Sequence, residues 1–384
     1  MNKRILFIAH DASRTGAPKV LLELLKRLSE ETGFSFDVAF RKGGPLLKEF
    51  EKISKCYIWE KEYSAKSILR AIIVHQNFEK LLSNRIRKKV LNNVRNNHYQ
   101  LVYANSAMSA DVLLDITNNV KIPIIQHIHE LEYMIQTFCD PVAFGKSVGR
   151  TTKFIAVSGI VKSNLIQNHG IKGKDIDLIH EFVPDEVGVI KNREQIRDEL
   201  KLSEDDFVVV SSGTVDLRKG TDLFVQIARS CLETSKLKFV WVGGDLTSKE
   251  YFLFRQDIQK LRLEKDVIIT GSVDNPYDYY NAADIFLMPS REDPFPLVCL
   301  EAAHLKKPIV CFEDAIGSTE FINNENGAVV PYFDMKAMTS EIIKMSEDSA
   351  LVREKGEAIY KASSKYNLEL AYDKIMKLLT SIVK

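Results

Sequence analysis

The chain has 384 residues, 45% of them hydrophobic and 27% charged, with a formal net charge of +1. This length exceeds what one hydrophobic core usually serves, so we expect two domains, and the near-neutral charge gives no support to a nucleic-acid binder. No apolar run approaches the ~20 residues that cross a bilayer, and the five scattered cysteines show no zinc-type spacing, which favours reduced cytosolic thiols.

The first apolar run, residues 4–9, is short and continuous, as in strands of a buried parallel sheet. A small-residue loop follows at 13–18, and Val20 to Leu28 show helical spacing. Doubly wound domains begin with this strand, loop and helix, and bind ligands at the carboxyl ends of strands. Gly16 would let a ligand approach the backbone closely, although the loop lacks the GxGxxG pattern of dinucleotide sites. A purely structural tight turn remains the alternative.

Residues 61–98 differ in composition, with nine Lys or Arg against two Glu. Apolar residues recur at helical spacing, and basic side chains occupy the face between them. A basic amphipathic helix of this kind can lie on an anionic membrane surface. It can equally be a solvated helix that packs on a sheet. The sequence leaves both readings open.

Two further strands are predicted at 101–104 and 122–129, and the second ends in His127, His129 and Glu130. Histidines at a strand end of such a sheet lie where substrates bind. His127 and His129 point the same way, so one can be catalytic and the other can support it. A zinc pair is conceivable, but no third ligand is spaced nearby. A hydrogen-bonded structural histidine is the alternative reading.

The same succession of strand, loop and helix begins again in the second half of the chain. Residues 207–213 read as a strand, 214–220 (TVDLRKG) as a loop, and a helix begins at Thr221. This repetition supports two α/β domains. We place the first domain at residues 1–184 and the second at 185–364. Residues 365–384 form a separate C-terminal helix.

The stretch 290–308, SREDPFPLVCLEAAHLKKP, is the most informative part of the chain. A helix is predicted from Leu297, with Pro296 at its start, where a missing N–H costs nothing. The unpaired N–H groups of such a helix start favour an anion such as phosphate. Asp293 and Glu301 bracket the turn, and carboxylates accept hydrogen bonds from sugar and ribose hydroxyls. An ordinary loop and helix with surface acids is the alternative.

The sequence DPFPLVCLE resembles the E-x7-E motif of the retaining glycosyltransferases of family 4, the group 1 glycosyl transferases. Counting back from Glu301, the spacing falls on Asp293. Either the first carboxylate is a shorter Asp, or Glu292 reaches in from one residue earlier. The AVS at 156–158 and the RKG at 218–220 also match the family pattern.

The resemblance is strong across residues 205–335 and thinner across 1–180. It implies an α/β fold of two Rossmann-like domains that face each other across a cleft, the GT-B arrangement. The first domain would bind the acceptor and the second the nucleotide-sugar donor. The C-terminal helix would cross back to pack on the first domain.

The resemblance also implies roles for individual residues. The catalytic candidates are His129, Lys219, Asp293 and Glu292. The candidates for binding the donor are Gly16, Thr214, Arg218, Lys219, Asp274, Pro296, Leu297, Val298 and Glu301. Thr214 stands where the family has an Arg, and Arg218 would replace that charge from another angle.

The implied function is a retaining, metal-independent transfer of a sugar from a nucleotide-diphosphate donor to a glycan or lipid-linked acceptor. The setting would be bacterial surface polysaccharide synthesis in the cytoplasm, with no cofactor beyond the donor substrate. Lipid-linked acceptors, common in the family, favour a peripheral contact of residues 66–95 with the inner face of the membrane. The alternatives are a sugar-nucleotide epimerase of the same fold and a catalytically silent nucleotide-sugar-binding protein.

Overall fold

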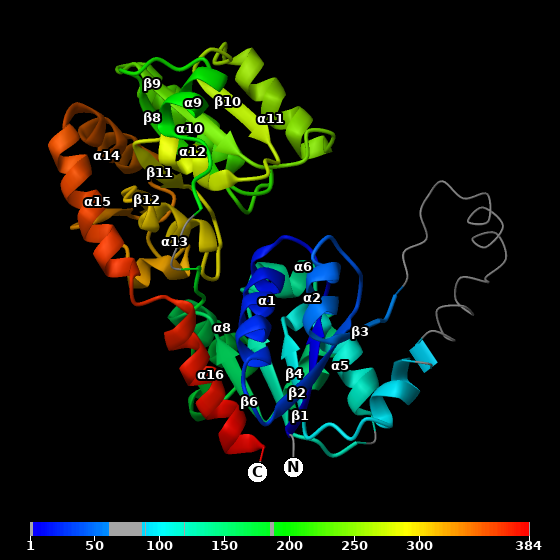
Figure 1. The fold of residues 1–384 in the computed structure, drawn as a ribbon. Coiled ribbons are helices and arrows are strands. Elements are labelled where there is room, and N and C mark those ends of the chain that lie inside the picture. The colour runs from blue at the N-terminus through cyan, green and yellow to red at the C-terminus, as the bar shows by residue number, and fades with distance from the viewer. Residues whose placement is uncertain (1–2, 61–86, 89, 119, 185–187, 384) are drawn as a thin grey trace, which may run out of the picture. The chain divides into compact units, whose positions relative to one another are not determined.

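The computed structural model describes residues 3–60, 87–88, 90–118, 120–184 and 188–383. Contacts divide the chain into unit 1, residues 1–180 with 368–384, and unit 2, residues 181–367 (Figure 1). The sequence predicts these divisions after residues 184 and 364. The divisions differ because Val183 pairs with Asn367, which keeps both segments in unit 2.

The described part of unit 1 contains one parallel sheet with the strand order β3-β2-β1-β4-β5-β6-β7. Its strands are β1 Lys3–Ala9, β2 Phe34–Phe40, β3 Lys55–Ile58, β4 Leu101–Asn105, β5 Ile124–Ile128, β6 Lys153–Ala156 and β7 Ile176–Leu178. From Ile5 to Ala9, β1 is fully buried, as a continuous apolar run predicts. Strand order reverses between β1 and β4, and ligands of doubly wound folds bind at such switch points.

Helices join the strands of unit 1, and the last helix of the chain returns to it. They are α1 Gly16–Ser29, α2 Leu47–Ile53, α5 Ala110–Thr117, α6 Glu132–Thr137, α7 Pro141–Val148, α8 Gly159–His169 and α16 Leu368–Ile382, with short 3-10 turns at Ala107–Ser109 and Gly173–Asp175. Helix α16 packs beside α1 (Figure 1), and Arg27 Nε donates to Glu369 Oε1 at 3.2 Å. The predicted return of the C-terminal helix to the first domain is thus confirmed.

The basic stretch at 61–98 lies largely outside the described residues, including 61–86. In its described end, residues 90–95 are helical, and Val90 and Val94 pack into the apolar core beside Trp59. Arg87 donates to Glu60 at 3.1 Å. The described end is therefore a helix packed on unit 1.

Unit 2 repeats the architecture within its described residues, with the sheet order β10-β9-β8-β11-β12-β13. The strands are β8 Phe207–Ser212, β9 Leu237–Val242, β10 Val267–Gly271, β11 Ile285–Met288, β12 Ile309–Phe312 and β13 Gly327–Val330. The helices are α9 Arg193–Glu199, α10 Thr221–Leu232, α11 Lys249–Lys260, α12 Pro276–Ala282, α13 Leu297–His304, α14 Met335–Glu347 and α15 Ser349–Ser363, with a 3-10 turn at Gly317–Glu320. All six strands run parallel, and the switch point lies between β8 and β11. The prediction of two Rossmann-like units is confirmed.

No helix within the described residues is both long enough and apolar enough to cross a membrane. All five cysteines are free thiols, and three of them, Cys231, Cys299 and Cys311, are buried. Burial raises the pKa of the Cys231 thiol to about 12, which keeps it protonated and unreactive at neutral pH.

Candidate functional site

The loop with Arg218 and Lys219 and the loop with Glu292 and Asp293 meet at the switch point of unit 2. Strands β8 and β11 are hydrogen-bonded neighbours, so the loops at their carboxyl ends lie at the same edge of the sheet. The main-chain N–H of Arg291 donates to the carbonyl of Arg218 at 2.8 Å. The Arg291 guanidinium also binds Asp222 at 2.8 Å through each of two nitrogens. The β11 loop is thus tied to the C-terminal part of the β8 loop and to the first turn of α10.

The β8 loop turns tightly to bring Lys219 back over the end of its own strand. Asp216 holds the turn, since its carboxylate accepts from the Lys219 N–H at 2.7 Å and from the Thr214 hydroxyl at 2.6 Å. Gly220 closes the loop in the left-handed region, with φ 76°, and precedes the first residue of α10. A Cβ at Gly220 would lie 2.1 Å from the carbonyl oxygen of Pro289, so only glycine allows the β8 and β11 loops to approach this closely.

Lys219 and Asp293 form the centre of this site. The Lys219 Nζ lies 2.5 Å from Asp293 Oδ2, and the Arg218 guanidinium is 3.7 Å from the same oxygen. Asp293 is 6% exposed. Its main chain is fixed on both sides, because its N–H donates to the Ala315 carbonyl and its carbonyl accepts from the Gly317 N–H. Two cations therefore converge on one rigidly held carboxylate.

The structure places Arg218 beside Asp293, whereas Thr214 bonds within its own loop. Besides facing Asp293, the Arg218 guanidinium donates to the main-chain carbonyl of Glu292 at 2.9 Å. Thr214 is exposed and bonds to Asp216. Asp274 is also exposed, on the loop after β10, two strands away from β8. The structure thus brings Arg218, Lys219, Glu292 and Asp293 together and leaves Asp274 apart from them.

Helix α13 begins directly after the acidic loop. Pro296 is the N-cap, one position before the predicted place inside the first turn, and Leu297 and Val298 are the first helical residues, both half-buried. The early N–H groups of a helix have no intrahelical partner and carry the positive end of its dipole. This helix start can therefore bind an anion beside the Arg218 and Lys219 side chains.

Glu301 lies one turn further along α13. It is buried, and the Tyr277 hydroxyl donates to its Oε1 at 3.3 Å. Burial, together with the charge of Glu301, raises the pKa of the Tyr280 hydroxyl, which donates to Ser212 at 2.7 Å. A buried carboxylate among phenol groups can accept hydrogen bonds from a pair of ligand hydroxyls. Tyr277 had no signal in the sequence, because it lies 24 positions before Glu301 in the chain.

In unit 1, the predicted residues gather at the carboxyl ends of β1, β4 and β5. Gly16 is the first residue of α1 rather than part of the preceding loop. His129 follows the end of β5, and its Nε2 lies 3.0 Å from Oδ1 of Asn105 at the end of β4. The rings of His127 and His129 have centroids 4.1 Å apart, on the same side of the strand. Asn105 was missed, because its partners lie 24 and 88 residues away in the chain.

The burial of His127 predicts that the stability of the folded protein depends on pH. It is 2% exposed, and its Nδ1 lies 2.8 Å from the Tyr103 hydroxyl. Burial, with the neighbouring His129, lowers the pKa of His127 well below its ordinary value. Below about pH 6.5 the unfolded chain therefore takes up a proton that the folded chain does not, so stability falls as the pH falls. This contribution is at most about 1.4 kcal/mol per pH unit.

We expect the His127→Phe variant to lose this acid-sensitive contribution. Urea unfolding at several values between pH 7.5 and pH 5 measures it, as the difference between the pH slopes of wild type and variant. Equal slopes would show that His127 does not stay neutral in the folded protein.

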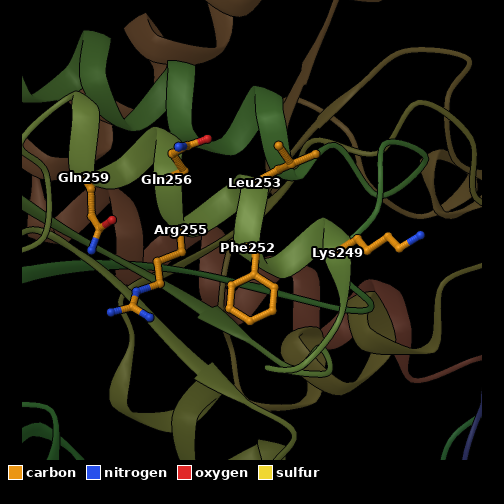
Figure 2. A pocket seen from close by; sticks show the side chains of 6 residues that line it. All are labelled: Lys249, Phe252, Leu253, Arg255, Gln256 and Gln259. Carbon is orange, nitrogen blue, oxygen red and sulfur yellow. The ribbon is translucent and has the colours of Figure 1, made fainter.

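A cavity of about 690 Å³ lies along α11, away from these residues (Figure 2). The six residues that line it are all on the outer face of this helix: Lys249, Phe252, Leu253, Arg255, Gln256 and Gln259. Figure 2 shows their side chains fanning out along α11 rather than converging on a point. Because none of the predicted site residues lines this cavity, the switch point of unit 2 remains the candidate site.

Known proteins match this chain along most of its length. The family described as Glycosyl transferases group 1 matches residues 192–365, and Glycosyltransferase Family 4 matches residues 14–187. The solved structure of Anabaena Alr3699/HepE in complex with UDP and glucose superposes with a TM-score of 0.82 at 19% identity. That superposition covers 99% of this chain and 100% of the other, and it shows a shared GT-B fold.

Relatives in sequence match shorter segments. The alpha-galactosylglucosyldiacylglycerol synthase of Streptococcus pneumoniae is 35% identical over 121 residues, 30% of this chain and 31% of that protein. The N-acetylgalactosamine-N,N'-diacetylbacillosaminyl-diphospho-undecaprenol 4-alpha-N-acetylgalactosaminyltransferase of Campylobacter jejuni is 28% identical over 218 residues, 56% of this chain and 57% of that protein. The matched segments thus span less than two thirds of these relatives. With two family matches that extend from residue 14 to residue 365, the chain belongs to the group 1 glycosyl transferases of family 4.

Proposed function

We propose that this protein transfers a sugar from a nucleoside-diphosphate donor to a glycan or lipid-linked acceptor, with retention at the anomeric carbon. One observation carries the proposal above the others. The loops of two neighbouring strands place Lys219 and Arg218 on the buried Asp293 carboxylate, directly before the N-terminus of α13. Cations, helix N–H groups and a carboxylate at one switch point suit a diphosphate joined to a sugar.

Each group would have a distinct part in the reaction. As the bond from C1 to the diphosphate breaks, its electron pair leaves with the phosphate oxygen, and negative charge accumulates there. Lys219, Arg218 and the first N–H groups of α13 would stabilise that charge, as fixed donors do in a preorganised site. The sugar becomes oxocarbenium-like. Asp293 would then accept hydrogen bonds from its hydroxyls, and Glu301 from those of the ribose.

The acceptor completes the reaction. Its hydroxyl oxygen forms the new bond to C1 on the face that the diphosphate leaves, and its proton passes to the departing phosphate. In unit 1, His129 is the residue proposed to contact the donor sugar. The relatives from S. pneumoniae and C. jejuni are named for products or acceptors that carry a lipid, which supports a lipid-linked acceptor here.

The activity is tested by incubating the protein with UDP-, GDP- and ADP-sugars, with and without a lipid-linked acceptor, and following diphosphate release. Proton NMR of the first product shows whether the anomeric configuration is retained. Conversion of the donor sugar to its epimer without acceptor would favour the epimerase. Binding without release of diphosphate would favour the silent binding protein, with Thr214 as the first residue to examine.

The two neighbouring acids can be separated by amide variants. Asp293 offers its carboxylate to Lys219 and Arg218, whereas Glu292 offers Arg218 its main-chain carbonyl, which Glu292→Gln retains. A hydrogen bond to a charged group contributes about 1.5–3 kcal/mol. We therefore expect Asp293→Asn to lower kcat at least about tenfold more than Glu292→Gln does. Steady-state donor turnover measures both, and the reverse order would assign the first carboxylate of the motif to Glu292.

A further inference from the structure

In unit 1, Asn105 connects the first turn of α1 to His129. Strand β4 lies between β1 and β5, and Asn105 is level with Ala9 and His127 in the sheet. Its side chain, in a residue that is 1% exposed, therefore lies among the carboxyl ends of three strands. The Asn105 Nδ2 donates to the carbonyl of Ala17 at 3.1 Å, and Oδ1 lies 3.0 Å from His129 Nε2.

The contact of Asn105 with Ala17 determines which side-chain atom of Asn105 faces His129. The Ala17 carbonyl can only accept, so the amide nitrogen of Asn105 must face it and the amide oxygen must face His129. That oxygen can also only accept, so Nε2 of His129 must carry a proton. In a neutral imidazole the lone pair is then on Nδ1. The tautomer of His129 thus follows from a main-chain carbonyl in α1.

The main chain at His129 is fixed separately by Glu130, which is buried. One oxygen of this carboxylate accepts from the N–H groups of His129 and Ala107, each at 3.0 Å, and the other accepts from the Ser106 hydroxyl. Ser106 has φ 110°, a costly conformation for a residue with a side chain. With the backbone held in this way, the contact with Asn105 is one of those that fix the rotation of the His129 ring, which also packs against His127.

We propose that Asn105 is a positioning residue that keeps the proton of His129 on Nε2 and ties the ring to the first turn of α1. This inference rests on the proposed function for its consequence in catalysis. Any partner of Nδ1, a hydroxyl of the donor sugar included, must then donate a hydrogen bond to it. A sugar presenting only an acceptor at that point would be bound poorly.

Nitrogen NMR tests the tautomer without any substrate. The full-length protein is labelled with ¹⁵N-histidine, and the resonances of His129 are identified by their loss in His129→Gln. At pH 7.5 we expect Nε2 to have the shift of a protonated nitrogen and Nδ1 that of an unprotonated one. In Asn105→Ala the two nitrogen shifts should move toward each other. The control is Asn97→Ala, which also removes from unit 1 an amide that makes two hydrogen bonds. This variant should leave the His129 spectrum unchanged.

A proton on Nδ1 in the wild-type protein would overturn the proposal, as would an unchanged spectrum in a folded Asn105→Ala. The wild-type spectrum decides the tautomer even if the variant fails to fold. In donor hydrolysis, misplacement of the ring should lower kcat about 10- to 100-fold in Asn105→Ala, with a smaller change in KM. If the wild-type protein turns over no nucleotide sugar, the proposed function fails while the NMR result still stands.

Discussion

Replacing Lys219 with alanine is expected to lower kcat for donor turnover by about 100- to 1000-fold, the usual effect of removing one fixed donor from a developing negative charge. The Lys219 side chain is mostly buried, and its Nζ lies 2.5 Å from Asp293 Oδ2, so its position is set before any ligand binds. Arg218, at 3.7 Å from the same oxygen, is too far away to replace it fully. Steady-state kinetics with the preferred nucleotide sugar measure this loss.

The same variant should fold but melt at a lower temperature. Without Lys219, Asp293 stays buried opposite Arg218 alone, and a buried charge that loses its partner destabilises the folded state. Lys236→Ala is the control, since Lys236 is an exposed lysine of unit 2 outside the site. We expect that control to match wild type in both kcat and Tm. A Lys219→Ala variant with wild-type kcat would remove Lys219 from the proposed mechanism.

Gly220→Ala is expected to destabilise unit 2 by about 3 kcal/mol or more, with loss of nucleotide binding. A left-handed conformation costs a residue with a Cβ roughly 1–2 kcal/mol. The new methyl group would also lie 2.1 Å from the Pro289 carbonyl oxygen, which is main chain at the end of β11 and cannot turn away as a side chain could. Relief of this clash requires the β8 and β11 loops to separate, which pulls Lys219 from Asp293.

Gly170→Ala separates these two contributions. Gly170 ends α8 with φ 65°, close to the 76° of Gly220, but a Cβ there would meet nothing within 4 Å. We expect this control to lose only about 1–2 kcal/mol in urea unfolding, the cost of the left-handed conformation. Equal losses in the two variants would show that the close approach of the loops in unit 2 is not required for stability.

The sequence predicts a strand well where the strand is buried on both faces, because its residues then form an uninterrupted apolar run. Every residue of β8 after Phe207 is buried, so the apolar run itself reveals this strand. Strands β2 and β3 escaped prediction, because β2 includes Asp37 and only one residue of β3, Tyr57, is buried. Asp37 is buried through long-range bonds, from the Arg4 guanidinium at 2.9 Å and from the Tyr99 hydroxyl. Such partners cannot be inferred from local periodicity.

The residues of the candidate site also differ in how well the sequence predicts them. Lys219 and Asp293 were found because each lies in a short motif with a family resemblance, and the neighbouring positions of β8 and β11 bring the motifs together. Asp216 and Asn105 were missed. Asp216 holds the turn of its own loop by accepting from the Lys219 N–H. Asn105 meets its partners only because the strand register places it level with Ala9 and His127. Spacing along the chain therefore predicted the charged residues that the structure brings together at the candidate site. The residues that support them depend on the folded topology.

The most direct test of the donor site is calorimetric and thermal-shift titration of wild type and Lys219→Ala with UDP, GDP, ADP and CMP and their sugar conjugates. We expect one diphosphate to stabilise the wild-type protein, by about 2.7 kcal/mol at a hundred times its Kd. That stabilisation should be largely lost in Lys219→Ala and kept in Lys236→Ala. A wild-type protein that no nucleotide stabilises, or a Lys219→Ala variant stabilised as strongly as wild type, would contradict the assignment of this switch point as the donor site.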